Sequence, residues 1–104
     1  MTSALWARRA LSQVRQALRG RVDWRDIDVP TAPPSLRRWP ASAVLRACGA
    51  TCLERSLVLQ RWESDHGRRV DVVVGVRRRP FRAHAWLDGE SAPSDLVEFQ
   101  RRTG

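Results

Sequence analysis

The chain has 104 residues, which suffices for one small domain with a single modest core. Hydrophobic residues make up 42% of the sequence, and no apolar run approaches the ~20 residues needed to cross a bilayer. Nineteen basic residues, all of them arginine, and eleven acidic residues give a net charge of +8. Arginines interrupt the N-terminal segment and leave it without an apolar stretch, so we predict no signal peptide and a cytoplasmic location.

The basic charge favours acidic or extended peptide partners, or nucleic acid, through long-range attraction. A solvated, arginine-rich surface is the simpler interpretation. The candidate metal ligands among cysteines and histidines are few, and their spacing matches no compact zinc finger: Cys48, Cys52, His66 and His84. We therefore expect no metal and no other cofactor. A disulfide between the two cysteines would close too short a loop to stabilise the fold.

The N-terminal half is expected to be helical. Apolar residues at three- and four-residue steps predict an amphipathic helix over 3–19, with Gly20 at its end. The next ten residues are expected to be irregular or briefly extended, followed by a proline-stiffened connection. A second short helix is predicted from about Ser35 or Pro40 to Cys48, because Pro40 excludes an unbroken helix across the whole stretch.

The clearest local signal is a helix start at Thr51. Thr51 and Glu54 have the spacing of a capping box, in which each side chain accepts a hydrogen bond from the other residue's backbone N–H. The pattern predicts a helix over about 52–66 with Cys52 as its first residue, and Gly67 stands where a C-terminal cap is expected.

After this helix the pattern changes to that of strands. Residues 70–76 are rich in valine and predict a strand, residues 77–80 a turn, and residues 81–88 a returning strand. We expect an antiparallel hairpin, and an α+β fold in which a small antiparallel sheet carries His84 and then Asp95. The connection after the hairpin is long enough to bring the chain back beside the histidine strand.

Cys52 and His84 are the candidate catalytic pair. The N-terminus of a helix favours negative charge and hence the thiolate, which is the nucleophilic form of cysteine. The free backbone N–H of Cys52 is a candidate donor to a tetrahedral oxyanion. His84 lies within a strand between two alanines, a rigid mount for a general base. Burial of Cys52 as a small hydrophobe, and of His84 in the core, are the structural alternatives. His66 is assigned no catalytic role.

A carboxylate that orients His84 is sought downstream of it. Asp88 lies four residues along the same strand, ~13 Å away at ~3.3 Å per residue, and is too distant to bond to His84. Asp95 follows the turn and is preferred over the remaining acids, Glu90 and Glu98.

Taken together, the blocks CLERSL around Cys52, GVR from Gly75 and FRAHAW around His84 resemble the leader peptidases of lasso-peptide biosynthesis. These are small members of the transglutaminase-like cysteine-protease superfamily. The similarity covers roughly residues 45–90. It implies a transglutaminase-like (papain-like) core over 49–104, with 1–48 as an N-terminal helical region of the same domain. It also implies that Cys52 is the nucleophile and His84 the base of a Cys-His-Asp triad, with Asp95 as the acid.

The resemblance implies partners as well. The substrate would be a ribosomally made precursor peptide with an N-terminal leader, which a separate recognition protein holds. The peptidase would cut at the leader–core junction, and an ATP-dependent macrolactam cyclase would act on the freed core. No membrane or nucleic-acid partner is expected. Candidate docking surfaces are the arginine-rich N-terminal helix and three tryptophans, for which burial in the core is the alternative: Trp6, Trp24 and Trp39.

Other functions are consistent with the same residues. Acyl transfer to an amine would use the same cysteine and histidine and would yield a crosslinked or amidated product. A non-catalytic, arginine-rich adaptor or nucleic-acid-binding module would bind in a salt-sensitive way that Cys52→Ala leaves unchanged. An inactive member of the family is a further alternative.

Overall fold

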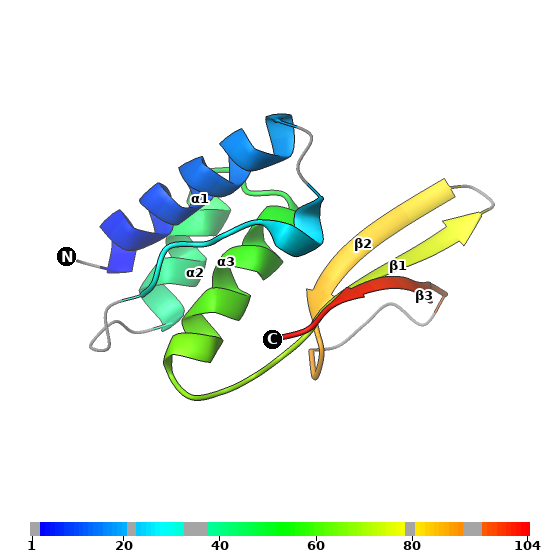
Figure 1. The fold of residues 1–104 in the computed structure, drawn as a ribbon. Coiled ribbons are helices and arrows are strands. Elements are labelled where there is room, and N and C mark those ends of the chain that lie inside the picture. The colour runs from blue at the N-terminus through cyan, green and yellow to red at the C-terminus, as the bar shows by residue number, and fades with distance from the viewer. Residues whose placement is uncertain (1–2, 21–22, 33–37, 79–80, 91–94) are drawn as a thin grey trace.

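A computed structural model of the chain describes residues 3–20, 23–32, 38–78, 81–90 and 95–104. Helices form one layer, and a small sheet extends from it to one side (Figure 1). The elements follow one another as α1 (Ser3–Arg19), η1 (Trp24–Asp26), α2 (Arg38–Ala47), α3 (Cys52–Asp65), β1 (Val72–Arg78), β2 (Phe81–Leu87) and β3 (Val97–Arg102). The expected α+β fold is confirmed.

The helices agree closely with the predicted ones. Helix α1 has the predicted bounds, and α3 ends one residue earlier than expected, at Asp65. Helix α2 begins at Arg38, so Pro40 lies in its first turn, where a missing backbone N–H removes no helical hydrogen bond. The alternative start at Ser35 lies outside the described residues. The segment expected to be irregular contains a single 3₁₀ turn, η1, capped by the Asp23 side chain.

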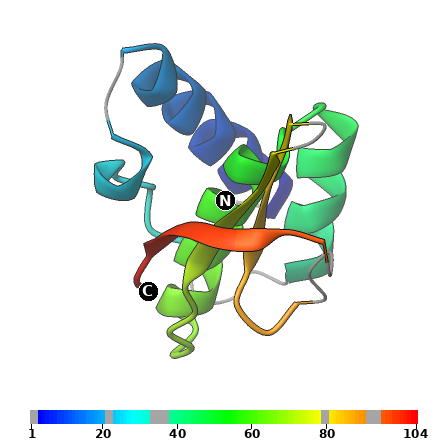
Figure 2. The ribbon, with the colours of Figure 1, turned by 90° about the vertical axis from the view of Figure 1, so that its right-hand side faces the viewer.

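The hydrophobic core lies between the three helices and continues to the helix-facing side of the sheet. Figure 2 shows the sheet in front of the helices. Trp6 is 1% exposed, and its indole N–H donates to the Pro30 carbonyl at 3.1 Å, so burial is the correct alternative for this tryptophan. Trp24 is partly buried against the core. The side chain of Trp39 lies outside the described residues. Among the described helices, none has the length and apolar character to span a membrane.

The sheet has the strand order β2-β1-β3, and all its pairs are antiparallel. The predicted hairpin is confirmed, although β1 starts two residues later than expected, at Val72. The expectation that the chain returns beside the histidine strand is wrong, because β3 pairs with β1 instead. The outer edge of β2 faces the start of α3, where the Ala85 N–H donates to Cys52. This edge is therefore covered by the helix start, and β3 does not pair along it.

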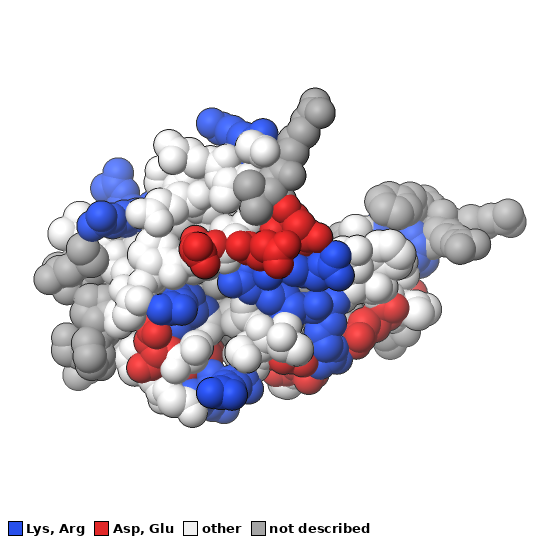
Figure 3. Space-filling model, viewed as in Figure 1, with Lys and Arg blue, Asp and Glu red and all other residues white. Residues whose placement is uncertain are grey.

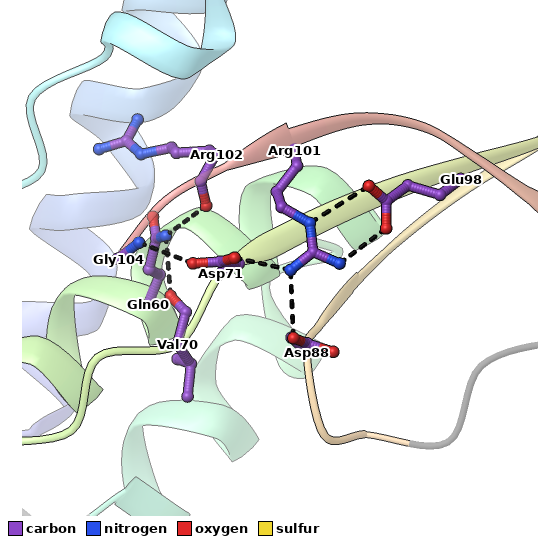
Figure 4. Close-up of polar contacts among 8 residues, drawn as sticks. All are labelled: Gln60, Val70, Asp71, Asp88, Glu98, Arg101, Arg102 and Gly104. Atoms are coloured by element: carbon purple, nitrogen blue, oxygen red, sulfur yellow. Dashed lines mark hydrogen bonds and ion pairs between the residues drawn. The ribbon is translucent and has the colours of Figure 1, made fainter.

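Polar contacts attach the sheet to the helices. The Gln60 side chain, on α3, donates to the carbonyls of Val70 and Arg102, each at 3.0 Å (Figure 4). One amide therefore holds the entry to β1 and the last residue of β3 against the same helix. The Trp24 indole adds a hydrogen bond of 2.9 Å to Gln100 of β3.

Candidate active site

Helix α3 presents Cys52 at its first position, and a complete capping box fixes that helix start. The Thr51 hydroxyl accepts from the Glu54 N–H at 3.2 Å, and Glu54 Oε1 accepts from the Thr51 N–H at 2.9 Å. The predicted capping box is thus confirmed. The first N–H groups of a helix have no intrahelical partner. The box uses those of Thr51 and Glu54, which leaves the N–H groups of Cys52 and Leu53 pointing out of the helix start.

Arg15, from α1, braces the capping carboxylate. Its Nε lies 3.2 Å from Glu54 Oε2, and its Nη2 donates to the Cys48 carbonyl at 3.1 Å. Glu54 is only 7% exposed, so its negative charge needs a partner in the structure. This brace cannot be predicted from the sequence, because its two residues are far apart in the chain and share no motif.

The Cys52 thiol lies at the outer edge of β2. Its Sγ accepts a hydrogen bond from the Ala85 N–H at 3.4 Å. The Ala85 nitrogen is two covalent bonds from the Cα of His84, and because such bonds are ~1.3–1.5 Å long, Sγ lies within ~6 Å of that Cα. Because β2 is an edge strand, no neighbouring strand stands between the thiol and the His84 residue. The structure therefore places the thiol beside the backbone of the strand that carries His84.

His84 and Trp86 share one face of β2. Side chains alternate along a strand, and Ala85 and Leu87 are buried toward the helices, so His84 and Trp86 point to the opposite face. Their rings are nearly parallel, with centroids 6.0 Å apart and an interplanar angle of 20°. The His84 side chain is half-buried and the indole limits the space on one side of it.

Gly75, on β1, makes room for this pair of rings. It is the partner of His84 in the β1–β2 register. A Cβ at this position would stand 2.6 Å from the Trp86 ring atom Cη2, closer than real contacts allow. Any other residue would push the indole away from the backbone and so disturb the neighbour of His84. An isolated glycine inside a strand is itself a signal of such close approach, so this role of Gly75 was open to prediction from the sequence.

The candidate acids have other partners in the structure. Asp95 forms an ion pair with Arg77 of β1. Glu90 accepts from the Leu87 N–H at 3.0 Å and pairs with Arg55 at 3.1 Å. Among the described residues, no carboxylate bonds to His84. The role of Asp95 as the orienting acid stays a prediction.

Glu98 is the candidate acid that shares a row with His84. Gly75 pairs with His84 on one side and with Glu98 on the other, so all three positions lie on one face, and the Trp86 indole lies over the glycine between the two ends. Two strand spacings separate them, ~10 Å at ~4.8 Å per strand. In the structure the Glu98 carboxylate instead pairs with Arg101 at 2.7 Å.

Arg101 gathers three carboxylates on the outer face of the sheet (Figure 4). It contacts Glu98 of its own strand, Asp71 before β1, and Asp88 after β2 at 3.1 Å. Hydrogen bonds to these carboxylates, Glu98 first, raise the pKa of Arg101, and the same guanidinium lowers the pKa of both Glu98 and Asp71. The network fixes the ends of the strands around the histidine face.

His66 and Cys48 lie outside this arrangement. His66 caps the end of α3, where its ring stacks on Trp62 with centroids 3.9 Å apart. Cys48 is exposed just beyond α2. Within the part of the chain that the structure describes, no group of three or more His, Cys, Asp or Glu side chains is placed to hold a metal ion.

The protein has an α+β fold in which a cysteine at a helix start lies against a strand that carries a histidine. This arrangement is typical of cysteine enzymes that act on acyl groups. The family model of the transglutaminase-like superfamily matches residues 1–100, and the chain belongs to this superfamily. The match includes the N-terminal half, in which the sequence alone showed no family motif. Searches of curated proteins and of solved structures returned no match. Membership supports a cysteine-protease or acyl-transfer type of function.

Proposed function

We propose that the protein is a cysteine endopeptidase that removes the leader from a lasso-peptide precursor. The observation that carries this proposal is the hydrogen bond of 3.4 Å between Cys52 Sγ and the Ala85 N–H. It holds a thiol at a helix start beside the backbone of the strand that carries His84, and nucleophilic cysteine catalysis pairs such a thiol with an imidazole. The motifs around both residues, and the superfamily match, support the same reading.

The proposed reaction proceeds through a thioester. The Cys52 thiolate attacks the scissile carbonyl carbon and forms a C–S bond, and the oxyanion accepts from the N–H of Cys52 that the capping box leaves unused. His84 then protonates the leaving amine, and the C–N bond breaks to release the core peptide. Water activated through His84 hydrolyses the thioester, which frees the leader carboxylate and restores the thiol. A carboxylate, proposed to be Asp95, orients the imidazole.

The proposal includes partners that the family resemblance implies. A separate leader-binding recognition protein would present the precursor, and a macrolactam cyclase would take the freed core amine. Cys52 and His84 are both half-exposed, so both are open to solvent at the protein's surface. This exposure supports a division of labour in which a partner contributes to gripping the substrate.

The first test needs no substrate. Alkylation of Cys52 and of Cys48 is followed separately against pH by peptide-mapping mass spectrometry, in the parent protein and in His84→Ala. We expect Cys52 to react faster than Cys48 at neutral pH, and His84→Ala to change the dependence of the Cys52 reaction rate on pH. Exposed Cys48 provides the internal control within the same molecule. Identical profiles for both cysteines, unaffected by His84→Ala, would contradict the proposal.

The second test uses a precursor peptide and the recognition protein. We expect cleavage at the leader–core junction and its complete loss in Cys52→Ala. A crosslinked or amidated product in place of a shortened one would assign the same residues to acyl transfer. Nucleic-acid binding that Cys52→Ala leaves intact, with no product of either kind, would favour the adaptor function.

A further inference from the structure

A groove of about 290 Å³ runs along α1 beside the end of α2. Its floor is the side chain of Leu11, which is 3% exposed. Three arginines of α1 line it, Arg8, Arg15 and Arg19, and Cys48 closes it at the end of α2. The spacing of seven and then four residues places the three arginines along one side of the helix.

The charge of this groove is largely uncompensated. Helix α1 contains no acidic residue. Within the described part of the chain, no carboxylate is within ion-pair distance of Arg8 or Arg19, and only Arg15 is paired, with Glu54. Elsewhere the arrangement differs: near η1 and the end of β3, basic and acidic side chains stand next to each other (Figure 3), as in the pair of Arg25 with Asp23.

The groove leads to the start of α3. Arg15 contacts the Cys48 carbonyl at 3.1 Å and Glu54 at 3.2 Å, and Glu54 in turn accepts from the Thr51 N–H at 2.9 Å. The residue after Thr51 is the proposed nucleophile, Cys52. A chain segment that lies along the arginines and leaves the groove at Cys48 therefore lies next to the loop 48–51, which immediately precedes Cys52.

The dimensions fit a short extended peptide. From Arg8 to Arg19 the helix rises ~16 Å at ~1.5 Å per residue. An extended chain covers that length with about five residues at ~3.3 Å each. Because carboxylates are the side chains that guanidinium groups bind best, those residues should include aspartate or glutamate.

We propose that this groove binds an acidic segment of about five residues in the peptide substrate and guides the neighbouring scissile bond to Cys52. The identity of the occupant rests on the proposed function, whereas the chemistry of the groove does not. The groove is tested by a binding measurement without cleavage. The groove proposal can therefore fail while the peptidase proposal stands, and the peptidase proposal can fail while the groove still binds an acidic peptide.

The test uses the full chain and a fluorescein-labelled peptide with five consecutive glutamates. Its binding is measured by fluorescence anisotropy to the parent protein and to the double variant Arg8→Gln/Arg19→Gln. The matched control is Arg9→Gln/Arg69→Gln, which changes the net charge equally at exposed positions that do not line the groove. Glutamine has a helix propensity close to that of arginine, so α1 should remain intact, which circular dichroism checks.

We expect the groove variant to weaken binding about 10-fold and the control less than about 2-fold. A peptide with five glutamines in place of the glutamates should bind neither to the parent protein nor to the two double variants. Equal weakening by both double variants would show that only the net charge attracts the peptide, and would overturn the proposal. Absence of binding to the parent protein would overturn it too. So would a single-stranded oligothymidine that binds with the same affinity and the same dependence on Arg8 and Arg19, because the groove would then be a general polyanion site.

Discussion

The helical layer and the sheet of this protein are held in place by different interactions. In the helices, large side chains such as Leu45, Leu57 and Leu59 are completely buried. In the sheet, the outer face depends on an arginine that binds three carboxylates, and β3 leaves Val97 71% and Phe99 65% exposed. Burial of apolar area is strong and non-directional, whereas exposed ion pairs contribute little each.

The candidate site lies where these two regions meet. Cys52 belongs to the well-packed layer and His84 to the sheet, and the thiol contacts the backbone of the strand at Ala85. The two halves of the site therefore have separate structural supports. Changes in the helices should lower overall stability, whereas changes in the sheet should alter the thiol–histidine pairing at a smaller cost in stability.

The largest effect is expected from Leu57→Ala. Leu57 is fully buried in α3, and the loss of its side chain leaves a cavity in the core. We expect the free energy of unfolding to fall by ~2–5 kcal/mol, measured by urea denaturation. Leu5→Ala is the control, since Leu5 is 56% exposed, and its effect should stay within ~0.5 kcal/mol. Equal losses in both variants would break the distinction between a packed layer and its surface.

Gly75→Ala tests the sheet half of the site. The added methyl group would meet the Trp86 ring at 2.6 Å, so we expect a loss of ~1–3 kcal/mol from overpacking. The displaced indole should also change the pH profile of Cys52 alkylation toward that of His84→Ala. The control is Gly20→Ala, whose Cβ would meet its nearest neighbour at an ordinary 3.5 Å. An unchanged alkylation profile in a destabilised Gly75→Ala protein would show that Trp86 does not position His84.

Thr51→Ala removes the cap of α3 and should cost ~1 kcal/mol, because the Glu54 N–H loses its acceptor. In a domain of this size such a loss lowers Tm by ~4–8 °C, which differential scanning calorimetry measures. Thr51→Ser keeps the hydroxyl and should retain most of the stability. If serine and alanine destabilise equally, the methyl group of threonine matters and the capping hydrogen bond does not.

The smallest effect is expected from Arg101→Gln, and it should depend on pH. Arg101 lowers the pKa of Asp71 and of Glu98 below their ordinary values of 3.8 and 4.5. Groups with a lowered folded-state pKa stabilise the fold above the unfolded-state pKa and cease to do so as the pH falls through the folded-state value.

We therefore expect the parent protein to exceed Arg101→Gln in Tm by a few degrees at pH 7, and the difference to shrink as the pH falls below about 4.5. Thermal denaturation across this range measures it, with Arg9→Gln as a control that lacks carboxylate partners among the described residues. A difference that persists unchanged in acid would assign the effect to packing of the Arg101 side chain.

Features that depend on neighbouring residues were predictable. The capping box at Thr51 and Glu54 was recognised from a three-residue spacing, and the structure shows both of its hydrogen bonds. The hairpin of β1 and β2 was recognised from two short β-rich runs separated by a turn. These elements place Cys52 and His84, so local sequence is sufficient to predict the candidate pair.

The orienting acid was harder to predict because its position depends on strand order. A connection of suitable length allows β3 to pair with either edge of the hairpin, and local sequence does not distinguish between them. The edge of β2 is taken by the start of α3, so β3 adds to β1 and Asp95 meets Arg77. The same strand order sets Glu98 in the row of His84.

The helix start at Cys52, the strand that carries His84 and the α+β class follow from local sequence, because capping, alternation and turn formation act over a few neighbouring residues. The contact of Cys52 with Ala85, the brace of Arg15 on Glu54 and the position of Trp86 over Gly75 depend on the packed fold. Each of these contacts joins different elements, and the packing of the whole chain selects which elements become neighbours.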